Sequence, residues 1–243
     1  MRLTRIFIEQ PLASGSRCLV GGSAAHHMLR VLRLAVGAEV TLFDGAGGEY
    51  AARIDAVHKD AVRVEVGAHA ATERESPLAV TLAQGISRGE RMDWVIQKAT
   101  ELGVRGIAPL ITERSVVRLD ARQAQKKSQH WRGIAIAACE QCGRNRLPEM
   151  AAPLDFQNFL AHAASAEGLR LLLSPLGEVR IGTIPPVETI TLLIGPEGGL
   201  APEERAAAIG KGFIEVQLGP RVLRTETAAI AALAALQQAF GDL

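Results

Sequence analysis

Two glycine-containing segments near the C-terminus hold the residue types from which a ligand site can be built. The first, Ile194–Leu200 (IGPEGGL), follows an apolar run and precedes a helical pattern. Its glycines let the backbone approach a ligand closely, with amide groups exposed ahead of a helix N-terminus. A phosphate loop is not indicated, because the G-x-x-x-x-G-K-[ST] and G-x-G-x-x-G patterns are both absent. The acidic Glu197 suits a neutral or cationic ligand, and a plain glycine-rich turn is the alternative.

The second segment, Leu218–Ala228 (LGPRVLRTETA), also joins an apolar run to a helical pattern. We expect Thr225 to cap that helix, and Glu226 in the first turn complements the helix dipole. Two arginines, Arg221 and Arg224, exceed what capping requires. They indicate ligand contact, with surface ion pairs as the alternative.

Two further motifs have simpler interpretations. Cys139 and Cys142 form a C-x-x-C pattern at the end of a helix, with no second cysteine pair and no histidine at zinc-ligand spacing, so we expect structural cysteines and no metal site. His26 and His27 stand at an expected helix start. The spacing of the next residues places Leu29 and Leu32 on one face and Arg30 and Arg33 on another, which fits either phosphate contact or solvation.

The elements that must position these residues fall into two patterns. Residues 39–43, 49–57 and 61–66 alternate apolar and polar residues as strands of a small barrel do, with a hairpin turn at residues 44–48. After the polar segment 72–77, five apolar runs at 78–83, 104–111, 169–173, 189–194 and 213–218 alternate with helical patterns at 91–102, 122–142, 155–163, 202–211 and 226–240. That alternation predicts an α/β fold with a buried parallel sheet. We therefore predict two domains, residues 1–72 and 73–243.

Composition narrows the class of protein further. The 243 residues are 48% hydrophobic and 22% charged, which excludes a disordered, collagenous or coiled-coil chain. No apolar stretch approaches the roughly 18 residues of a membrane span, the first ten residues do not resemble a signal peptide, and three cysteines favour the reducing cytoplasm. The net charge of +1 hides a basic region, since residues 86–150 contain 12 Lys and Arg against seven acids. Such a region can bind a polyanion.

Seven motifs occur in an order that resembles one family. They are His27–Arg33 (HMLRVLR), Ser87–Glu90 (SRGE), Gln97–Val104 (QKATELGV), Glu113–Ser115 (ERS), Ala138–Pro148 (ACEQCGRNRLP), Leu193–Leu200 (LIGPEGGL) and Leu218–Ala228. Together they resemble the bacterial 16S ribosomal RNA uridine-N3 methyltransferases of the SPOUT superfamily, across essentially the whole chain. One departure is Ala201, where a serine-like helix cap is expected; its loss costs about 1 kcal/mol of helix stability.

The resemblance implies a fold and a cofactor. It implies a small N-terminal PUA-like β-barrel that binds RNA, and a C-terminal α/β domain with a deep trefoil knot, of the SPOUT type, which dimerises and binds S-adenosylmethionine. Such knots are rare exceptions to the usual rules of chain threading. The implied cofactor-binding residues are Leu173, Ser174, Ile194, Gly195, Pro196, Glu197, Gly198, Gly199, Leu218, Gly219, Val222, Leu223, Thr225, Thr227 and Ala228.

The implied reaction methylates N3 of a uridine in the RNA of the small ribosomal subunit. We hypothesise that Arg224, with Arg114 as second candidate, stabilises the uridine anion, while Glu197 or Glu226 accepts the proton or orients groups. The implied RNA-binding residues are Arg5, Arg30, Arg33, Arg88, Arg91, Arg144 and Arg146.

Two other functions compete with this interpretation. One is a SPOUT methyltransferase acting on a different RNA nucleotide. The other is a non-catalytic RNA-binding module whose α/β domain only dimerises. The two intact glycine-containing segments argue against the second alternative, and failure to bind S-adenosylmethionine would favour it.

Overall fold

The computed structural model describes residues 4–117, 119–165 and 167–243, and the chain divides into two compact units. The first unit contains residues 1–75 and 139–147, and the second contains residues 76–138 and 148–243. Residues 139–142, the last turn of a long helix, thus belong to the N-terminal unit, although residues 76–138 separate them from it in the sequence. Across the described ranges, no helix is long and apolar enough to cross a membrane.

The N-terminal unit is built on a five-stranded mixed sheet with the strand order β1-β3-β4-β5-β2. Strands β1 and β3 pair in parallel, and the other neighbours pair antiparallel. The expected hairpin turn is confirmed, since it joins β3 to β4 and the Asp44 carboxylate accepts a hydrogen bond from the Ala46 amide. The elements are β1 (Thr4–Phe7), β2 (Arg17–Val20), α1 (Gly22–His26), the π-helical turn η1 (His27–Val31), β3 (Glu39–Phe43), β4 (Glu49–Val57) and β5 (Val62–Ala70).

The two histidines do not start a helix, which corrects the expectation from the sequence. The helix α1 begins at Gly22, and His27 opens the π-helical turn that follows it. Arg33 lies beyond that turn with φ at 52°, so Arg30 and Arg33 do not share one helical face. Both arginines are exposed.

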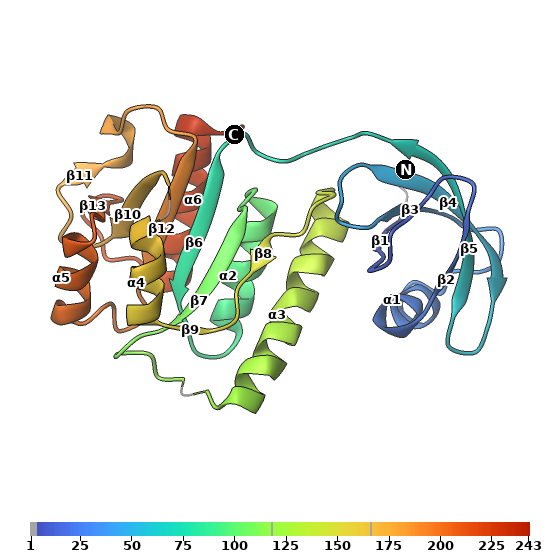
Figure 1. The fold of residues 1–243 in the computed structure, drawn as a ribbon, viewed down its shortest axis with the longest axis horizontal. Helices are drawn as coiled ribbons and strands as arrows, with labels where there is room; N and C mark the ends of the chain where they lie inside the picture. The colour runs from blue at the N-terminus through green and yellow to red at the C-terminus, as the bar shows by residue number, and fades with distance from the viewer. Residues whose placement is uncertain (1–3, 118, 166) are drawn as a thin grey trace. The chain divides into compact units, whose positions relative to one another are not determined.

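The C-terminal unit is an α/β layer structure whose sheet has the order β11-β13-β10-β12-β6-β7-β8, with β9 also paired to β7 (Figure 1). All its strand pairs are parallel, which confirms the predicted parallel sheet. Its strands are β6 (Ala79–Gly85), β7 (Gly106–Ile111), β8 (Glu149–Met150), β9 (Leu154–Asp155), β10 (Leu169–Leu173), β11 (Val179–Arg180), β12 (Thr189–Ile194) and β13 (Ile214–Gln217). Its helices are α2 (Glu90–Glu101), α3 (Ala121–Cys142), α4 (Phe156–Ser165), the 3-10 turn η2 (Ile181–Thr183), α5 (Pro202–Gly210) and α6 (Thr225–Phe240).

Helices cover both faces of this sheet, which is why its central strands are mainly apolar. Ile190, Leu192 and Ile194 pack into a core with α2, α3 and α6, whereas Leu193 faces a second core with α4 and α5. Gly103 after α2 and Gly143 after α3 have φ values of 77° and 99°, a left-handed conformation that ends those helices. Parallel strands place all their carboxyl ends at one edge, and the two glycine-containing segments both follow strands there.

Candidate active site

A cavity of about 620 Å³ opens at the carboxyl edge of the parallel sheet, entirely within the C-terminal unit. Its lining comes mainly from the segments that follow β10, β12 and β13, together with Arg91 of α2 and Arg114 after β7. The volume lies in the range of about 300–1,000 Å³ that is usual for small-molecule sites. The segments after these three strands therefore form one cavity, although they are distant from one another in the sequence.

The structure brings nearly all the site residues expected from the sequence to this cavity. The expected cofactor-binding residues that line it are Leu173, Ser174, Ile194, Gly195, Pro196, Glu197, Gly198, Gly199, Leu218, Gly219, Val222, Leu223, Thr225 and Ala228. Thr227 is exposed and is not part of the lining. The four side chains expected to do chemistry, Arg114, Glu197, Arg224 and Glu226, all line the cavity.

A hydrogen-bonded link joins the two glycine-containing segments. The Thr225 hydroxyl donates to the Gly195 carbonyl at 2.7 Å, and the Gln84 side-chain amide donates to the Thr225 hydroxyl at 3.0 Å. Thr225 is the first residue of α6, whose N-cap is Arg224, so the expected capping role of Thr225 is wrong. Its hydroxyl ties the loop after β12 to the start of α6 instead. Gln84, at the end of β6, is fully buried, and sequence patterns gave no signal for it.

Glu197 is held as a carboxylate beside the cavity. Its Oε1 accepts hydrogen bonds from the Arg88 backbone amide at 2.9 Å and from Arg91 Nη1 at 2.8 Å. Burial alone would raise the pKa of Glu197, but these donors outweigh it and hold the pKa below the ordinary value for glutamate. A low pKa suits a carboxylate that orients other groups and makes it a weak proton acceptor.

Glu226 differs from Glu197 in how its carboxylate is satisfied. Arg91 Nε lies 3.8 Å from Glu226 Oε1, so Arg91 bridges the two carboxylates. Glu226 Oε2 is buried and, among the described residues, accepts no hydrogen bond. A buried carboxylate oxygen without a donor costs free energy and is unusual in a folded protein. The oxygen is therefore available to a group of a ligand.

Arg114 is positioned by a buried glutamate in α5. Glu204 accepts a hydrogen bond from the Glu113 amide at 2.8 Å and another from the Ala201 amide at 3.0 Å. The second bond is half of a capping box, whose other half is missing because Ala201 has no hydroxyl. Arg114 Nη1 then donates to the Gly198 carbonyl at 3.1 Å. Glu204 thus fixes the segment from which Arg114 reaches the glycine loop.

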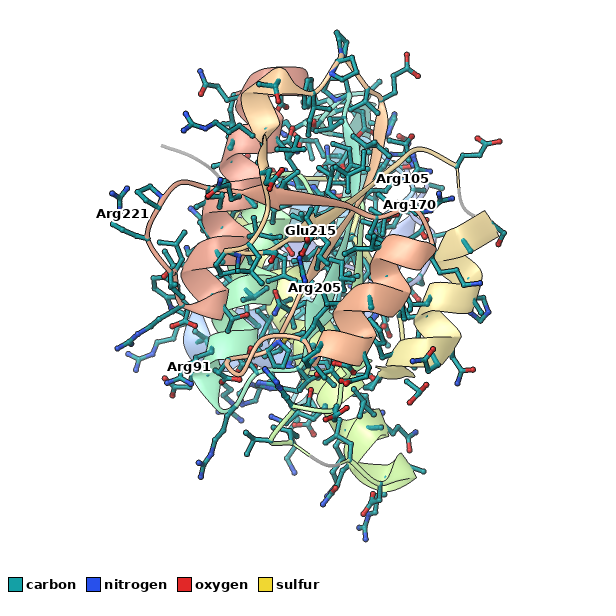
Figure 2. All side chains as sticks on the ribbon, turned by 90° about the vertical axis from the view of Figure 1, so that its left-hand side faces the viewer. Arg91, Arg105, Arg170, Arg205, Glu215 and Arg221 are labelled. Atoms are coloured by element: carbon teal, nitrogen blue, oxygen red, sulfur yellow. The ribbon has the colours of Figure 1, made fainter. Side chains whose placement is uncertain are left out.

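Two more arginines of the cavity wall have different surroundings. Arg205 of α5 pairs with Glu215 of β13, and Figure 2 shows the two side chains directed at each other. The Arg205 hydrogen bond is the main reason that the pKa of Glu215 lies below its ordinary value. Arg221 stands at the outer edge of the loop between β13 and α6, away from the sheet (Figure 2).

The arginines expected to bind RNA divide into buried and exposed groups. Arg5 and Arg144 are only 6% and 3% exposed, within the N-terminal unit. Arg5 donates to Asn145 Oδ1 at 2.6 Å and pairs with Glu49, while Arg144 pairs with Glu75. Their guanidinium groups are thus engaged with internal partners, which leaves the exposed arginines as candidates for RNA contact. Those are Arg30, Arg33, Arg88, Arg91 and Arg146.

The C-x-x-C cysteines behave as structural residues. Cys139 is fully buried, and burial raises the pKa of its thiol to about 12. Both Cys139 and Cys142 are free thiols.

Comparisons with known proteins bear on the whole chain. A family of RNA methyltransferase domains matches residues 74–237, and a family of RNA methyltransferase PUA domains matches residues 20–67. The ribosomal RNA small subunit methyltransferase E of Buchnera aphidicola (subspecies Schizaphis graminum) is 35% identical over 243 residues, covering 100% of this chain and 98% of the relative. The chain belongs to the ribosomal RNA small subunit methyltransferase E family.

The backbone of this methyltransferase E chain is also similar to solved structures. The methyltransferase E of Neisseria gonorrhoeae, solved bound to S-adenosylmethionine, has a TM-score of 0.90 and 37% identity, with both chains covered completely. A Legionella pneumophila protein solved with the cofactor S-adenosylmethionine has a TM-score of 0.96 and 44% identity, again over both complete chains. The Bacillus subtilis methyltransferase E is 32% identical over 96% of each chain. The match to the PUA family shows that the N-terminal unit contains a PUA-like domain.

Proposed function

We propose that the protein transfers a methyl group from S-adenosylmethionine to N3 of a specific uridine in 16S ribosomal RNA of the small ribosomal subunit. The observation that supports this most directly is the cavity at the sheet edge, where both glycine-containing segments meet two glutamates and several arginines. Two relatives of high backbone similarity hold S-adenosylmethionine. When bound, this cofactor supplies a methyl group on a positively charged sulfur, which is open to attack by a nucleophilic nitrogen.

The residues of the cavity fit such a cofactor. Apolar side chains such as Leu173, Leu218 and Leu223 and the backbone of residues 195–199 can enclose a neutral adenosine. The carboxylate of Glu197 suits the amine and sulfonium charges of the cofactor. The cavity therefore offers neutral surface and negative charge where the cofactor has neutral and positive groups.

The proposed chemistry needs a proton acceptor and a cation near the target base. N3 of uridine is a weak acid, and its negative charge develops as the proton leaves. Arg224, and Arg114 as second candidate, would stabilise that charge. Glu226 is the better proton acceptor, because its Oε2 accepts no hydrogen bond from the described residues whereas Glu197 is held ionised by Arg91 and the Arg88 amide. We assign an orienting role to Glu197.

RNA binding is proposed for the PUA-like barrel and the exposed arginines, namely Arg30, Arg33, Arg88, Arg91 and Arg146. Phosphate contacts by arginine give affinity and salt dependence without reading sequence. Specificity would come from the shape of the assembled subunit, with the target base unstacked into the cavity. We keep the proposed domains as residues 1–72 for RNA binding and 73–243 for cofactor binding and dimerisation.

A trefoil knot of the SPOUT type is proposed for the C-terminal unit. It is supported by the position of β13, which lies between β10 and β11 although only residues 174–178 connect those two strands. A Cβ atom on Gly177 would lie 2.8 Å from the Val216 carbonyl carbon, so the connection crosses directly over β13. Residues from each of these segments line the cavity, which joins the proposed knot to the proposed cofactor site.

A homodimer is proposed on the same unit. Two large apolar side chains that are exposed in a single copy support the homodimer. Trp94 on α2 is 56% exposed, and Val222 in the loop between β13 and α6 is 79% exposed. Packing a second copy against these side chains would remove their apolar surface from water, which is favourable. Light scattering of the purified protein should give a mass of two chains.

The test is methyl transfer from labelled S-adenosylmethionine to small ribosomal subunits purified from cells that lack the protein. We expect one methyl group per subunit, on uridine N3. Arg224→Ala and Arg114→Ala should bind cofactor normally and lose turnover. Intact turnover in both variants would refute the roles assigned to these arginines, and absence of cofactor binding by the native protein would favour an RNA-binding module.

A further inference from the structure

The first part of α3 carries a cationic surface that the proposed reaction does not use. Residues 121–138 include four Lys and Arg side chains and no Asp or Glu, whereas the chain as a whole has 27 bases against 26 acids. The remainder of the chain therefore has a net negative charge, and this helix is a local exception. The basic residues are Arg122, Lys126, Lys127 and Arg132.

The helical period places two of these four basic residues on one outer face. Arg122 and Lys126 are four residues apart and lie next to each other on that face, and Gln129 follows one turn later. All three are exposed. Lys127 lies on a flank, with its ammonium group 6.0 Å from the ring centre of the buried Trp131. The outer face therefore presents two cations and an amide.

The charged groups around this face leave it positive. His130, on the same flank as Lys127, pairs with Asp93 of α2 at 2.8 Å. Asp120 caps the helix, since its Oδ1 accepts a hydrogen bond from the Gln123 amide at 2.7 Å. These two carboxylates thus have partners at the flank and at the helix end, and neither lies on the outer face.

The cationic face starts at the same sheet edge as the cavity. Strand β7 ends at Ile111 at that edge, residues 112–117 follow it, and α3 starts at Ala121 (Figure 1). The same connection carries Arg114, which lines the cavity and binds the Gly198 carbonyl. A polyanion lying along Arg122 and Lys126 would thus be bound at the edge where the cavity opens.

We propose that this face of α3, defined by Arg122, Lys126 and Gln129, binds the phosphate backbone of the substrate RNA. The inference rests on the proposed function and adds a binding surface on the C-terminal unit. Arginine matches phosphate geometry in a bidentate manner, and lysine acts as a point charge. A protein partner is disfavoured, because the face lacks the aromatic or aliphatic anchor on which stable protein interfaces depend. Its phosphate contacts would fix the register of the RNA relative to the cavity.

The test compares Arg122→Glu/Lys126→Glu with Lys126→Glu and with Lys211→Glu. Lys211 is exposed at the C-terminal end of α5, away from the cavity edge, so its substitution makes the same charge change as Lys126→Glu at another place in the same unit. Glutamate is a good helix former and is favourable in a first helical turn, so the double variant should fold. Binding to small ribosomal subunits and to deproteinised small-subunit RNA is measured between 50 and 200 mM salt, and cofactor binding by calorimetry.

We expect the slope of log affinity against log salt to fall by roughly 1.4–1.8 in the double variant, as two lost phosphate contacts predict. Lys126→Glu should lose about half of that, Lys211→Glu should match the native protein, and cofactor binding should be unchanged in all three. If the double variant binds RNA like Lys211→Glu, the inference is overturned while the proposed function stands. A loss confined to assembled subunits, without any loss on free RNA, would indicate a ribosomal protein partner and also overturn it. Native protein that binds cofactor but neither RNA substrate would overturn both proposals.

Discussion

Gly85, at the end of β6, supports the glycine loop from outside the cavity. A Cβ atom at this position would lie 2.4 Å from the Pro196 nitrogen and 2.5 Å from its Cδ atom. Ordinary contact begins near 3.4 Å, so Gly85→Ala must move the loop by about 1 Å. The clash involves backbone and a rigid ring, and no flexible side chain can yield. The substitution should therefore displace residues 195–199 without removing any group that contacts the cofactor.

The free energy involved follows from the nature of the clash. Adding one carbon to a tightly packed site costs typically about 1–3 kcal/mol. If the loop moves away in the free protein, cofactor binding must restore it, and the dissociation constant rises by roughly 5- to 150-fold. If the loop stays, the same cost appears as a loss of unfolding free energy. The two losses should together amount to about 1–3 kcal/mol.

Calorimetry of S-adenosylmethionine binding and urea unfolding of the same samples measure both losses. Gly133→Ala is the matched control, because Gly133 lies in α3 with open space where its Cβ would be. This control should bind cofactor normally and gain about 0.5–1 kcal/mol of stability. A Gly85→Ala protein with native stability and native cofactor affinity would refute the argument that loop placement requires glycine here.

Three further outcomes follow from the contacts described above. Glu215→Gln should lower the free energy of unfolding at pH 7, because a carboxylate with a lowered pKa stabilises the folded protein above its unfolded pKa. This stabilisation is lost as the pH falls through the folded pKa, so the difference in unfolding free energy between variant and native protein should shrink below about pH 4.5. An equal difference at pH 3 would contradict this. With a thiol pKa of about 12, Cys139 should react with iodoacetamide at pH 8 more slowly than Cys142 in peptide mass analysis, and equal rates would contradict its burial. Glu204→Gln, which keeps one acceptor oxygen for two backbone amides, should lose about 1–3 kcal/mol of stability in urea unfolding together with turnover; native values of both would refute its positioning of Arg114.

Much of the C-terminal fold could be predicted from the sequence, because its strands are buried on both faces. Residues 169–173 and 189–194 were expected as strands with the bounds that β10 and β12 have. Helix ends could be predicted where chemistry marks them, as at Pro202, the first residue of α5. The helix before His27 was placed too late, because its N-cap, Gly21, makes no side-chain hydrogen bond and gives no capping signal.

In the candidate site too, residues required by the local loop conformation could be predicted, whereas residues that act through distant contacts could not. Glycine and charged residues within the two C-terminal segments could be found by pattern, because a loop that closely approaches a ligand needs them locally. Gln84 and Glu204 could not, since their roles come from hydrogen bonds to segments 141 and 91 residues away. The resemblance implied Arg5 and Arg144 as RNA-binding residues. Their buried ion pairs with Glu49 and Glu75 depend on contacts that no local pattern contains.

The most direct test of the central claim is mass analysis of uridine in small-subunit ribosomal RNA from cells with and without the gene for this chain. We predict that N3-methyluridine is present in the first RNA, absent from the second, and restored by the native chain but not by Arg224→Ala. An unchanged N3-methyluridine signal in cells lacking the chain would contradict the proposed reaction.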